Sequence, residues 1–177
     1  MEDDVQLVLA MPRRELFRIQ GFVPPSDLQV LESIAEESYY AAPRLIAADF
    51  DAKEVRLGLV LLQGQQVLVS DHGVLLHATS VPPETGRMGT GLGALKQFAL
   101  AAGRQLMGIA DGRIELAGFC NEDALQECRG IFILVYKFRV PDSAQAPEGM
   151  SWIPLVRLGA VPLDPVSALV SDVLKER

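Results

Sequence analysis

The 177-residue chain is short of histidine, tryptophan, cysteine and positive charge. It has two histidines, one tryptophan and two cysteines, and its 16 Lys and Arg residues face 23 Asp and Glu residues, giving a net charge of -7. The negative excess argues against general binding to nucleic acid or to an anionic membrane surface. No apolar run is long enough to span a membrane, and the N-terminal MEDDVQ is acidic where a signal peptide is basic. We therefore expect a soluble, cytoplasmic protein that contacts neither nucleic acid nor membrane.

The scarce cysteines and histidines also restrict metal and disulfide chemistry. Cys120 and Cys128 bracket the acidic segment NEDALQE. A disulfide there would need an oxidising compartment, so we expect two free thiols. Two thiols with no histidine nearby do not make a structural zinc site, and His77 lies inside an apolar strand pattern where a structural role is expected. Hydrophobic content of 49% and charged content of 22% indicate one folded domain with a sizeable core.

The most informative stretch is 86–108, GRMGTGLGALKQFALAAGRQLMG. It begins with four glycines in eight residues, and Thr90 is a suitable N-cap for a helix that follows. Apolar residues then recur at steps of three and four and form one stripe of a helix: Leu92, Leu95, Phe98, Ala99, Ala102 and Leu106. Between Thr90 and Met107 there is no Asp or Glu, and Lys96 and Arg104 are the only charged residues.

The segment GALKQFALAAG, 93–103, resembles the second half of a Nudix box, G-x5-E-x7-R-E-U-x-E-E-x-G-U, where U is a bulky apolar residue. With the last glycine of the box on Gly103, its arginine falls on Lys96 and its first helical glutamate on Gln97. The two metal-binding glutamates of the family fall on Leu100 and Ala101, and the early glutamate falls near Met88. Hard cations need oxygen ligands, which Leu100 and Ala101 do not have. The resemblance therefore implies that the helix of the family is retained and its metal site lost. The alternative interpretation is an ordinary core helix, which would give a similar pattern.

The N-terminal segment MPRRELFRIQGFVP, 11–24, is similar to the leader of bacterial Nudix-like proteins often labelled phosphoesterases. In that group a strand, "PR", an apolar pair and "QGF" precede the Nudix fold. Arg14, Glu15, Leu16 and Gly21 also match part of a Nudix box, but no glycine-rich loop precedes them, and Arg18 and Ile19 stand where carboxylates belong. Near the other end, Glu148, Trp152 and Leu158 nearly reproduce an E-x-x-W-x-x-x-x-L stretch of the family. The resemblance implies a leader over 1–54 that packs on a Nudix-like domain over 55–177, so that the two form one compact unit. It also implies a bacterial protein.

The patterns predict an α/β protein, a Nudix-like α/β/α sandwich with a mixed sheet. We expect helices over 26–39, 90–107 and from Asp164–Pro165 onward, where Asp164 is the N-cap and Pro165 the first helical residue. The first helix should end at Tyr39–Tyr40 and Pro43, and 44–53 should be a connection that holds Asp49 and Asp51. Strands are expected over 5–11, 55–62, 67–70, 74–80, 113–119 and 130–140, and 151–158 should form a strand and a turn. Because the pattern alternates from Val135 on, 130–140 should be a half-buried edge, and its apolar run 131–138 a candidate interface between copies.

Two functional classes remain open from the sequence. The first is a non-catalytic Nudix-like module with no catalytic residue, metal or cofactor, which binds a protein partner or a second copy, or senses a nucleotide. The second is a Nudix-type phosphohydrolase of nucleoside diphosphate derivatives that uses magnesium at a relocated site. Glycine backbone N–H groups and the positive end of a helix suit an anion, and the residues available for this are Gly86, Arg87, Gly89, Thr90, Gly91 and Lys96. The relocated acids would be Glu84 and Glu148, while Glu115, Glu122 and Asp123 are further carboxylates that more often are surface charges.

Overall fold

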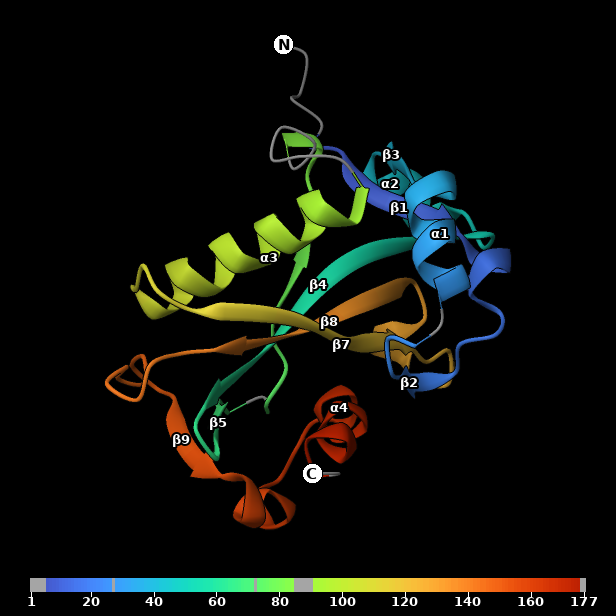
Figure 1. Cartoon of the computed structure of the whole chain (residues 1–177). Coiled ribbons are helices and arrows are strands. Elements are labelled where there is room, and N and C mark those ends of the chain that lie inside the picture. Colours follow the sequence, from blue (N-terminus) through green and yellow to red (C-terminus); the bar gives the residue numbers. More distant parts are fainter. Residues whose placement is uncertain (1–5, 27, 72, 85–90, 176–177) are drawn as a thin grey trace.

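The core of the protein is a nine-stranded mixed sheet with helices on both faces (Figure 1). The computed structural model describes residues 6–26, 28–71, 73–84 and 91–175. The main strand order is β2-β7-β8-β4-β1-β3, while β5 and β6 also pair with β4, and β9 pairs with β5. The strands are β1 (Val8–Pro12), β2 (Gly21–Val23), β3 (Tyr39–Ala41), β4 (Ala52–Gln63), β5 (Gln66–Val69), β6 (Leu76–Ser80), β7 (Arg113–Asn121), β8 (Ile131–Arg139) and β9 (Ser151–Pro154).

The centre of the sheet is a parallel pair formed by β4 and β8. The register runs from Glu54 opposite Ile131 to Leu62 opposite Arg139, and every other strand pair is antiparallel. The expectation that β8 is a half-buried edge is wrong, because β7 and β4 flank it and residues 132–138 are all buried. The apolar run 131–138 therefore lies inside the protein, and its expected role as an interface between copies is wrong for the same reason.

Helices cover the two faces of the sheet and make the predicted α/β/α sandwich. They are α1 (Leu28–Glu37), α2 (Pro43–Ala48), α3 (Gly91–Met107) and α4 (Pro165–Lys175), with short 3-10 helices η1 (Arg13–Leu16), η3 (Gln126–Cys128) and η4 (Leu155–Ala160). Figure 1 shows α3 and α1 on one side of the sheet and α4 on the other. Two clusters of buried side chains correspond to these layers, one containing Ile34 of α1 and Leu95 of α3, the other Val170 of α4. Of the helices in the described parts of the chain, none is long and apolar enough to cross a membrane.

The start of α4 confirms its predicted cap. The Asp164 carboxylate accepts hydrogen bonds from the backbone N–H groups of Val166 (3.0 Å) and Ser167 (2.9 Å), and Pro165 is the first helical residue. The Ser167 hydroxyl in turn accepts from the N–H groups of Val74 and Leu75, both at 3.1 Å. The first turn of α4 is thereby fastened to the segment that leads into β6.

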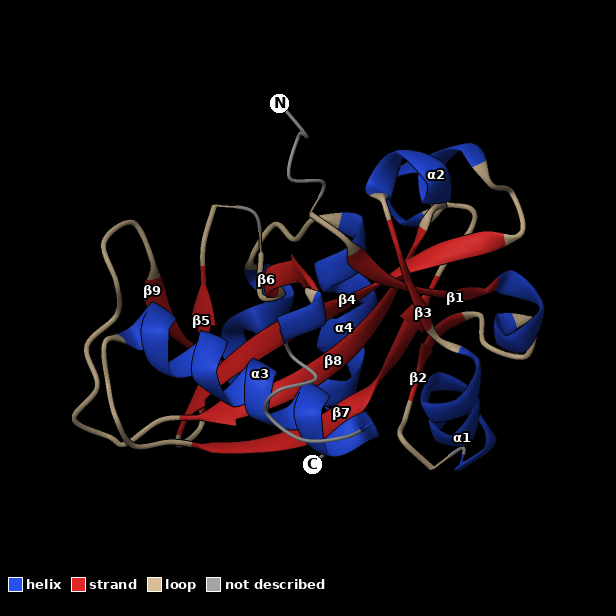
Figure 2. Cartoon of the chain, turned by 90° about the horizontal axis from the view of Figure 1, so that it is seen from above, coloured by secondary structure: helices blue, strands red, loops and turns tan. Residues whose placement is uncertain are grey.

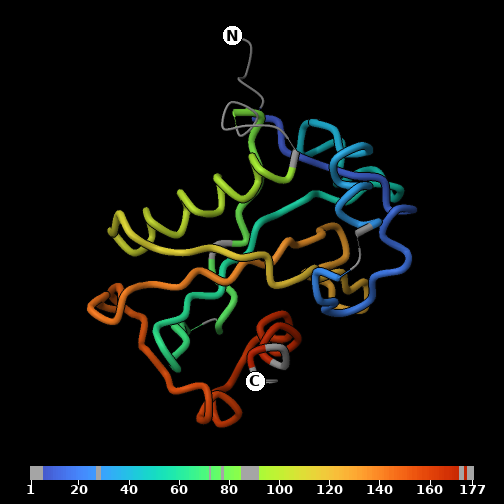
Figure 3. The backbone as a smooth tube through the Cα atoms, viewed as in Figure 1, coloured from blue at the N-terminus to red at the C-terminus, as the bar shows by residue number. Residues whose placement is uncertain are grey.

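The N-terminal segment contributes β1, β2 and β3 to the same sheet, and Figure 3 shows it, in blue, gathered at one end of the molecule. Two expectations fail here. Residues 39–41 form strand β3 after the helix, since Tyr39 and Ala41 pair with β1. The expected connection over 44–53 contains α2 and the beginning of β4, because Pro43 occupies the first turn of a six-residue helix. Ile46 of α2 is buried in a small third cluster with Val8 and Ala10 of β1. Figure 2 shows α2 at the same end of the molecule as β1 and β3.

Candidate functional site

Helix α3 packs on the sheet through the apolar stripe that its sequence predicts. Leu95 and Ala99 are buried, and Phe98, Ala102 and Leu106 are partly buried against the same cluster. Gly103 marks the closest approach, because a Cβ there would lie 2.9 Å from Cγ of Phe138 on β8. A glycine inside a helix costs stability unless close packing requires it, so this contact gives a physical reason for the glycine on which the Nudix-box register depends.

The opposite side of α3 carries a shallow hollow of about 360 Å³ lined by Gln97, Leu100, Ala101 and Arg104. The resemblance places glutamates of the Nudix box at Gln97, Leu100 and Ala101. Arg104 lies about one helical turn beyond Ala101. Gln97, Ala101 and Arg104 are exposed, and Leu100 is half-buried. The four lining residues include no carboxylate, and among the described residues no group of three His, Cys, Asp or Glu side chains is placed to hold a metal ion. The hollow instead combines the amide of Gln97, the apolar side chains of Leu100 and Ala101, and the guanidinium of Arg104.

The predicted anion-binding loop lies mostly outside the described residues. Gly86, Arg87, Gly89 and Thr90 belong to 85–90, which the structure does not describe. Gly91 is the first residue of α3, and Lys96 is exposed on the same helix. The anion-binding role expected of these residues therefore stays a prediction.

The two relocated acids belong to different parts of the fold. Glu84 is exposed just before 85–90 and acts electrostatically on Tyr40 of β3. Glu148 is exposed in the loop that leads to β9, which is orange in Figure 1. The other carboxylates considered from sequence have structural partners: Glu115 pairs with Arg139 at 3.8 Å, Glu122 accepts the N–H of Ala124 at 2.9 Å, and Asp123 forms ion pairs.

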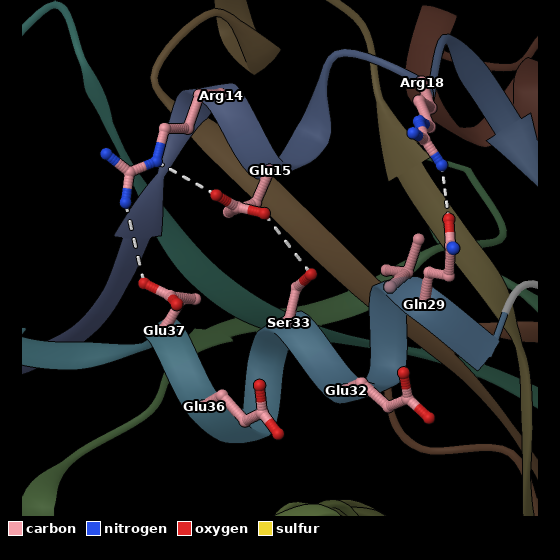
Figure 4. Close-up of a pocket in the computed structure, with 9 residues that line it drawn as sticks. Arg14, Glu15, Arg18, Gln29, Glu32, Ser33, Glu36 and Glu37 are labelled. Atoms are coloured by element: carbon pink, nitrogen blue, oxygen red, sulfur yellow. Dashed lines mark hydrogen bonds and ion pairs between the residues drawn. The ribbon is translucent and has the colours of Figure 1, made fainter.

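A charged crevice of about 360 Å³ separates η1 from α1 (Figure 4). Arg14 lies 3.0 Å from the Glu15 carboxylate and 3.6 Å from that of Glu37, and the Ser33 hydroxyl donates to Glu15 at 3.5 Å. On the neighbouring side Arg18 donates to the side-chain oxygen of Gln29. The contacts of Glu37, Ser33 and Gln29 connect the N-terminal segment to α1.

The sequence patterns do not reveal a buried ionic centre at the beginning of β4. The Lys53 ammonium is fully buried, donates to the Asn121 side-chain oxygen and lies 2.7 Å from the Asp123 carboxylate. Arg13 approaches the same carboxylate at 2.8 Å, and the Asn121 amide donates to the carbonyls of Leu16 (3.3 Å) and Ile19 (2.8 Å). A lysine at a strand boundary ordinarily points to solvent, so only the tertiary structure, which brings Lys53 beside Asn121 and Asp123, reveals this one.

The electrostatics of this centre extend to the neighbouring cysteines. Partial burial disfavours ionised Asp123, but the hydrogen bonds and positive charges of Lys53 and Arg13 outweigh it and lower the pKa of Asp123. Cys120 and Cys128 are both free, as expected, and both are buried. The hydrogen bond between the thiols raises the pKa of Cys120 and lowers that of Cys128, and the charge of Lys53 also favours the thiolate of Cys128. Their burial makes them part of the core.

The fold resembles solved proteins although no family model and no curated protein sequence matches the chain. The candidate Nudix hydrolase Tm1382 superposes with a TM-score of 0.75 at 15% identity, over 96% of this chain and 98% of its own. A candidate oxidoreductase from Sinorhizobium meliloti 1021, SMa0793, superposes with a TM-score of 0.51 at 22% identity, over 77% of this chain and 45% of its own. The chain therefore has a Nudix-like α/β fold, as predicted, and these identities establish the fold alone.

Proposed function

We propose that this protein is a non-catalytic Nudix-like domain that senses a ligand or binds a protein partner. The proposal depends chiefly on the hollow of α3, where Gln97, Leu100 and Ala101 occupy the positions that the resemblance gives to acidic residues. A pyrophosphohydrolase of this type needs a cluster of carboxylates to hold divalent cations against its substrate. Neither Leu100 nor Ala101 supplies an oxygen ligand, and Arg104 repels a cation from the same hollow.

The residues that remain in and near the hollow favour an anionic ligand. Arg104 offers a fork of N–H donors that suits a phosphate or carboxylate, and Lys96 adds a second exposed cation on α3. Gln97 donates and accepts hydrogen bonds, and half-buried Leu100 provides an apolar surface. Such a combination suits the phosphate and the uncharged parts of a nucleoside diphosphate derivative, which would be bound without being cleaved.

Calorimetric titration and turnover assays test the absence of catalysis. Titration with magnesium or manganese should reveal no specific site on α3. Dinucleoside polyphosphates, nucleotide sugars and oxidised nucleoside triphosphates should remain intact. Magnesium-dependent turnover on the order of 1 s⁻¹, abolished by Glu84→Gln or Glu148→Gln, would instead establish a phosphohydrolase with a relocated site.

Ligand binding is tested with ADP-ribose as the probe. We expect binding without magnesium, weakened about ten-fold by Arg104→Ala through loss of a charge-assisted contact. Arg157→Ala is the matched control, because Arg157 is exposed on η4, away from α3. Equal weakening by both substitutions would mean that general charge, and not the hollow, attracts the ligand.

A further inference from the structure

A third cavity lies beside the ionic centre at Lys53, between the segment 17–20 that follows η1 and the loop that follows β7. Its volume is about 200 Å³, and its lining includes Phe17, Gln20, Glu122 and Asp123, so we refer to it as the Phe17 cavity. It shares no lining residue with the hollow of α3 or with the charged crevice. Sites that enclose a drug-sized ligand measure roughly 300–1,000 Å³, so this smaller cavity suits a single ring system.

Hydrogen bonds of the fold hold the two walls of the Phe17 cavity together. The buried Asn121 amide donates to the carbonyls of Leu16 (3.3 Å) and Ile19 (2.8 Å), which joins the segment after η1 to the end of β7. The ion pair between Arg13 and Asp123, at 2.8 Å, makes a second link between the same two parts of the chain. Walls that are already positioned in this way lose little conformational entropy when a ligand binds.

The Phe17 cavity offers polar groups that the fold itself leaves unused. Asp123 makes both of its ion pairs through Oδ1, and its side chain is 51% exposed, so its Oδ2 can accept a hydrogen bond from a ligand. Glu122 accepts the N–H of Ala124 through Oε1, which leaves Oε2 as a second acceptor. The exposed Gln20 amide makes no hydrogen bond to another described residue. Two carboxylate oxygens and one amide are therefore available to a ligand.

The charges beside the Phe17 cavity balance one another. Arg13 and Lys53 are positive, and Asp123 and Glu122 are negative. Arg129 donates to the Asp123 carbonyl at 3.5 Å but does not line the cavity. A cation or an anion would therefore gain little from the local charge and would still have to give up its hydration. A neutral ligand with N–H groups for the two carboxylate oxygens fits this environment better.

We propose that the Phe17 cavity binds a neutral, flat heterocycle in which a ring carbonyl, a ring N–H and an exocyclic amino group lie side by side, as they do in guanine and in pterins. The ring stacks on Phe17, whose side chain lines the cavity and is 74% exposed. The N–H and amino groups donate to the free oxygens of Asp123 and Glu122, and the ring carbonyl accepts from the Gln20 amide. Adenine presents an acceptor where this edge has its N–H, so it does not suit the carboxylates. The site is separate from α3 and does not depend on the proposed function.

Saturation-transfer NMR titrations of the full chain with guanosine, inosine, adenosine and biopterin test the proposal. Guanosine or biopterin should bind saturably, and the tighter of the two identifies which ring system carries the recognised edge. Inosine lacks the amino group of guanosine and should bind about ten-fold more weakly than guanosine, because one hydrogen bond to a carboxylate is lost. Adenosine should not bind. Equal affinities for guanosine and adenosine, or no saturable binding of either guanosine or biopterin, would overturn the proposal.

Substitutions of two exposed aromatic residues locate the binding site. Phe17→Ala should weaken binding of the tighter ligand about ten-fold through the loss of stacking, and Phe17→Trp should retain binding. Phe50→Ala is the matched control, because Phe50 is 88% exposed and its carbonyl accepts from Arg13 at 2.9 Å, but it does not line the cavity. Gln20→Ala, at another exposed position, should weaken binding several-fold and gives a second test of the same wall if Phe17→Ala does not fold. Equal weakening by Phe17→Ala and Phe50→Ala, or unchanged affinity in Gln20→Ala, would overturn the assignment.

Two further measurements exclude other occupants and the other site. Arginine amide acetylated at its α-amino group is a planar cation, and tighter binding of this probe than of guanosine and biopterin would identify a basic side chain of a partner protein as the occupant, which would overturn the proposal. Arg104→Ala should leave binding of the heterocycle unchanged, because Arg104 lines the hollow of α3 and not the Phe17 cavity. Loss of binding in Arg104→Ala would place the ligand on α3 and would also overturn the proposal.

Discussion

The ionic centre at Lys53 and the hollow on α3 use charge in opposite ways. At the centre a fully buried ammonium is satisfied by Asn121 and Asp123, and these contacts hold the N-terminal segment against the sheet. On α3 the charges of Lys96 and Arg104 are exposed, and no carboxylate lines the hollow. The comparison separates charges that are paired within the fold from the exposed cations of α3, to which the proposed function assigns a ligand.

Among the substitutions considered, removing the carboxylate that pairs with Lys53 should cause the largest loss of stability. We expect Asp123→Ala to lower the free energy of unfolding by about 2 kcal/mol, because it leaves a buried cation without its carboxylate. The value is below the range for fully buried pairs since the Asp123 side chain is 51% exposed. Urea denaturation measures the change.

Lys53→Met is the informative companion, because it removes the buried charge itself and keeps most of the side-chain volume. Its cost should be smaller, about 1 kcal/mol, and should arise mainly from the unsatisfied oxygen of Asn121. Asp111→Ala, at an exposed position outside the centre, should have almost no effect. If Lys53→Met proves costlier than Asp123→Ala, the centre stabilises the fold through the packing of Lys53 and not through its charge.

The packing of α3 is tested by two glycine substitutions on the same helix. Gly103→Ala should cost about 1–2 kcal/mol, because its methyl group would press against Phe138 and displace the helix from the sheet. Gly93→Ala should stabilise by up to about 1 kcal/mol, since a Cβ there meets no atom within 4 Å and alanine favours the helix. Thermal melting of both variants gives the comparison, and equal shifts in Tm would contradict the close approach at Gly103.

Restoring acids to the hollow should be tolerated. We expect Gln97→Glu combined with Leu100→Glu and Ala101→Glu to fold with a loss of about 1 kcal/mol from mutual repulsion and from the half-buried Leu100 position. Thermal melting with and without magnesium would show whether a cation relieves the repulsion. A variant that fails to fold would place Leu100 and Ala101 in the core and make the register on the Nudix box wrong.

The smallest expected effect is a change in acid sensitivity. Folding lowers the pKa of Asp123 from its usual value of 3.8, so its contribution to stability is complete above that pH and is lost as the pH falls through the folded pKa. The stability difference between the unsubstituted protein and Asp123→Asn should therefore shrink as the pH is lowered below about 4. Urea titrations at pH 7 and pH 3 measure it, and a difference that stays constant would mean that Asp123 has the same pKa in the folded and unfolded chain.

The sequence predicts the Nudix-like framework because its signals are local. The stripe on α3, the Asp164 cap and the apolar run of β4 each depend on residues close together in the chain, and the structure contains all three elements. The prediction that β8 is an edge strand is wrong because alternation after Val135 reflects only side-chain types. Burial of β8 depends on its two neighbours in the sheet, β7 and β4. Helix α2 was not predicted because a six-residue helix is too short to show a repeating apolar pattern.

The candidate site was predictable only in part. The location of Gln97, Leu100 and Ala101 close together on α3 follows from helical spacing, and the structure places them around a single hollow with Arg104. The Lys53 centre could not be foreseen, because Arg13, Lys53 and Asp123 come from distant segments and meet only through the pairing of β1 and β4 and the loop after β7. The proximity of Glu84 to Tyr40 likewise depends on tertiary structure.

The parallel pairing of β4 and β8 has a consequence for how the chain reaches this structure. It joins Glu54 to Ile131 across β5, β6, α3 and β7, a separation on the order of 80 residues whose closure delays the ladder. The hairpins β4–β5 and β7–β8 join strands that are consecutive in the chain, the second through a connection that contains η3, and can form before it. Until the two hairpins meet, the long apolar strand β4 is not paired with β8 and can pair with other chains instead. Refolding yield should therefore fall as protein concentration rises, and slow docking of preformed hairpins should limit the rate.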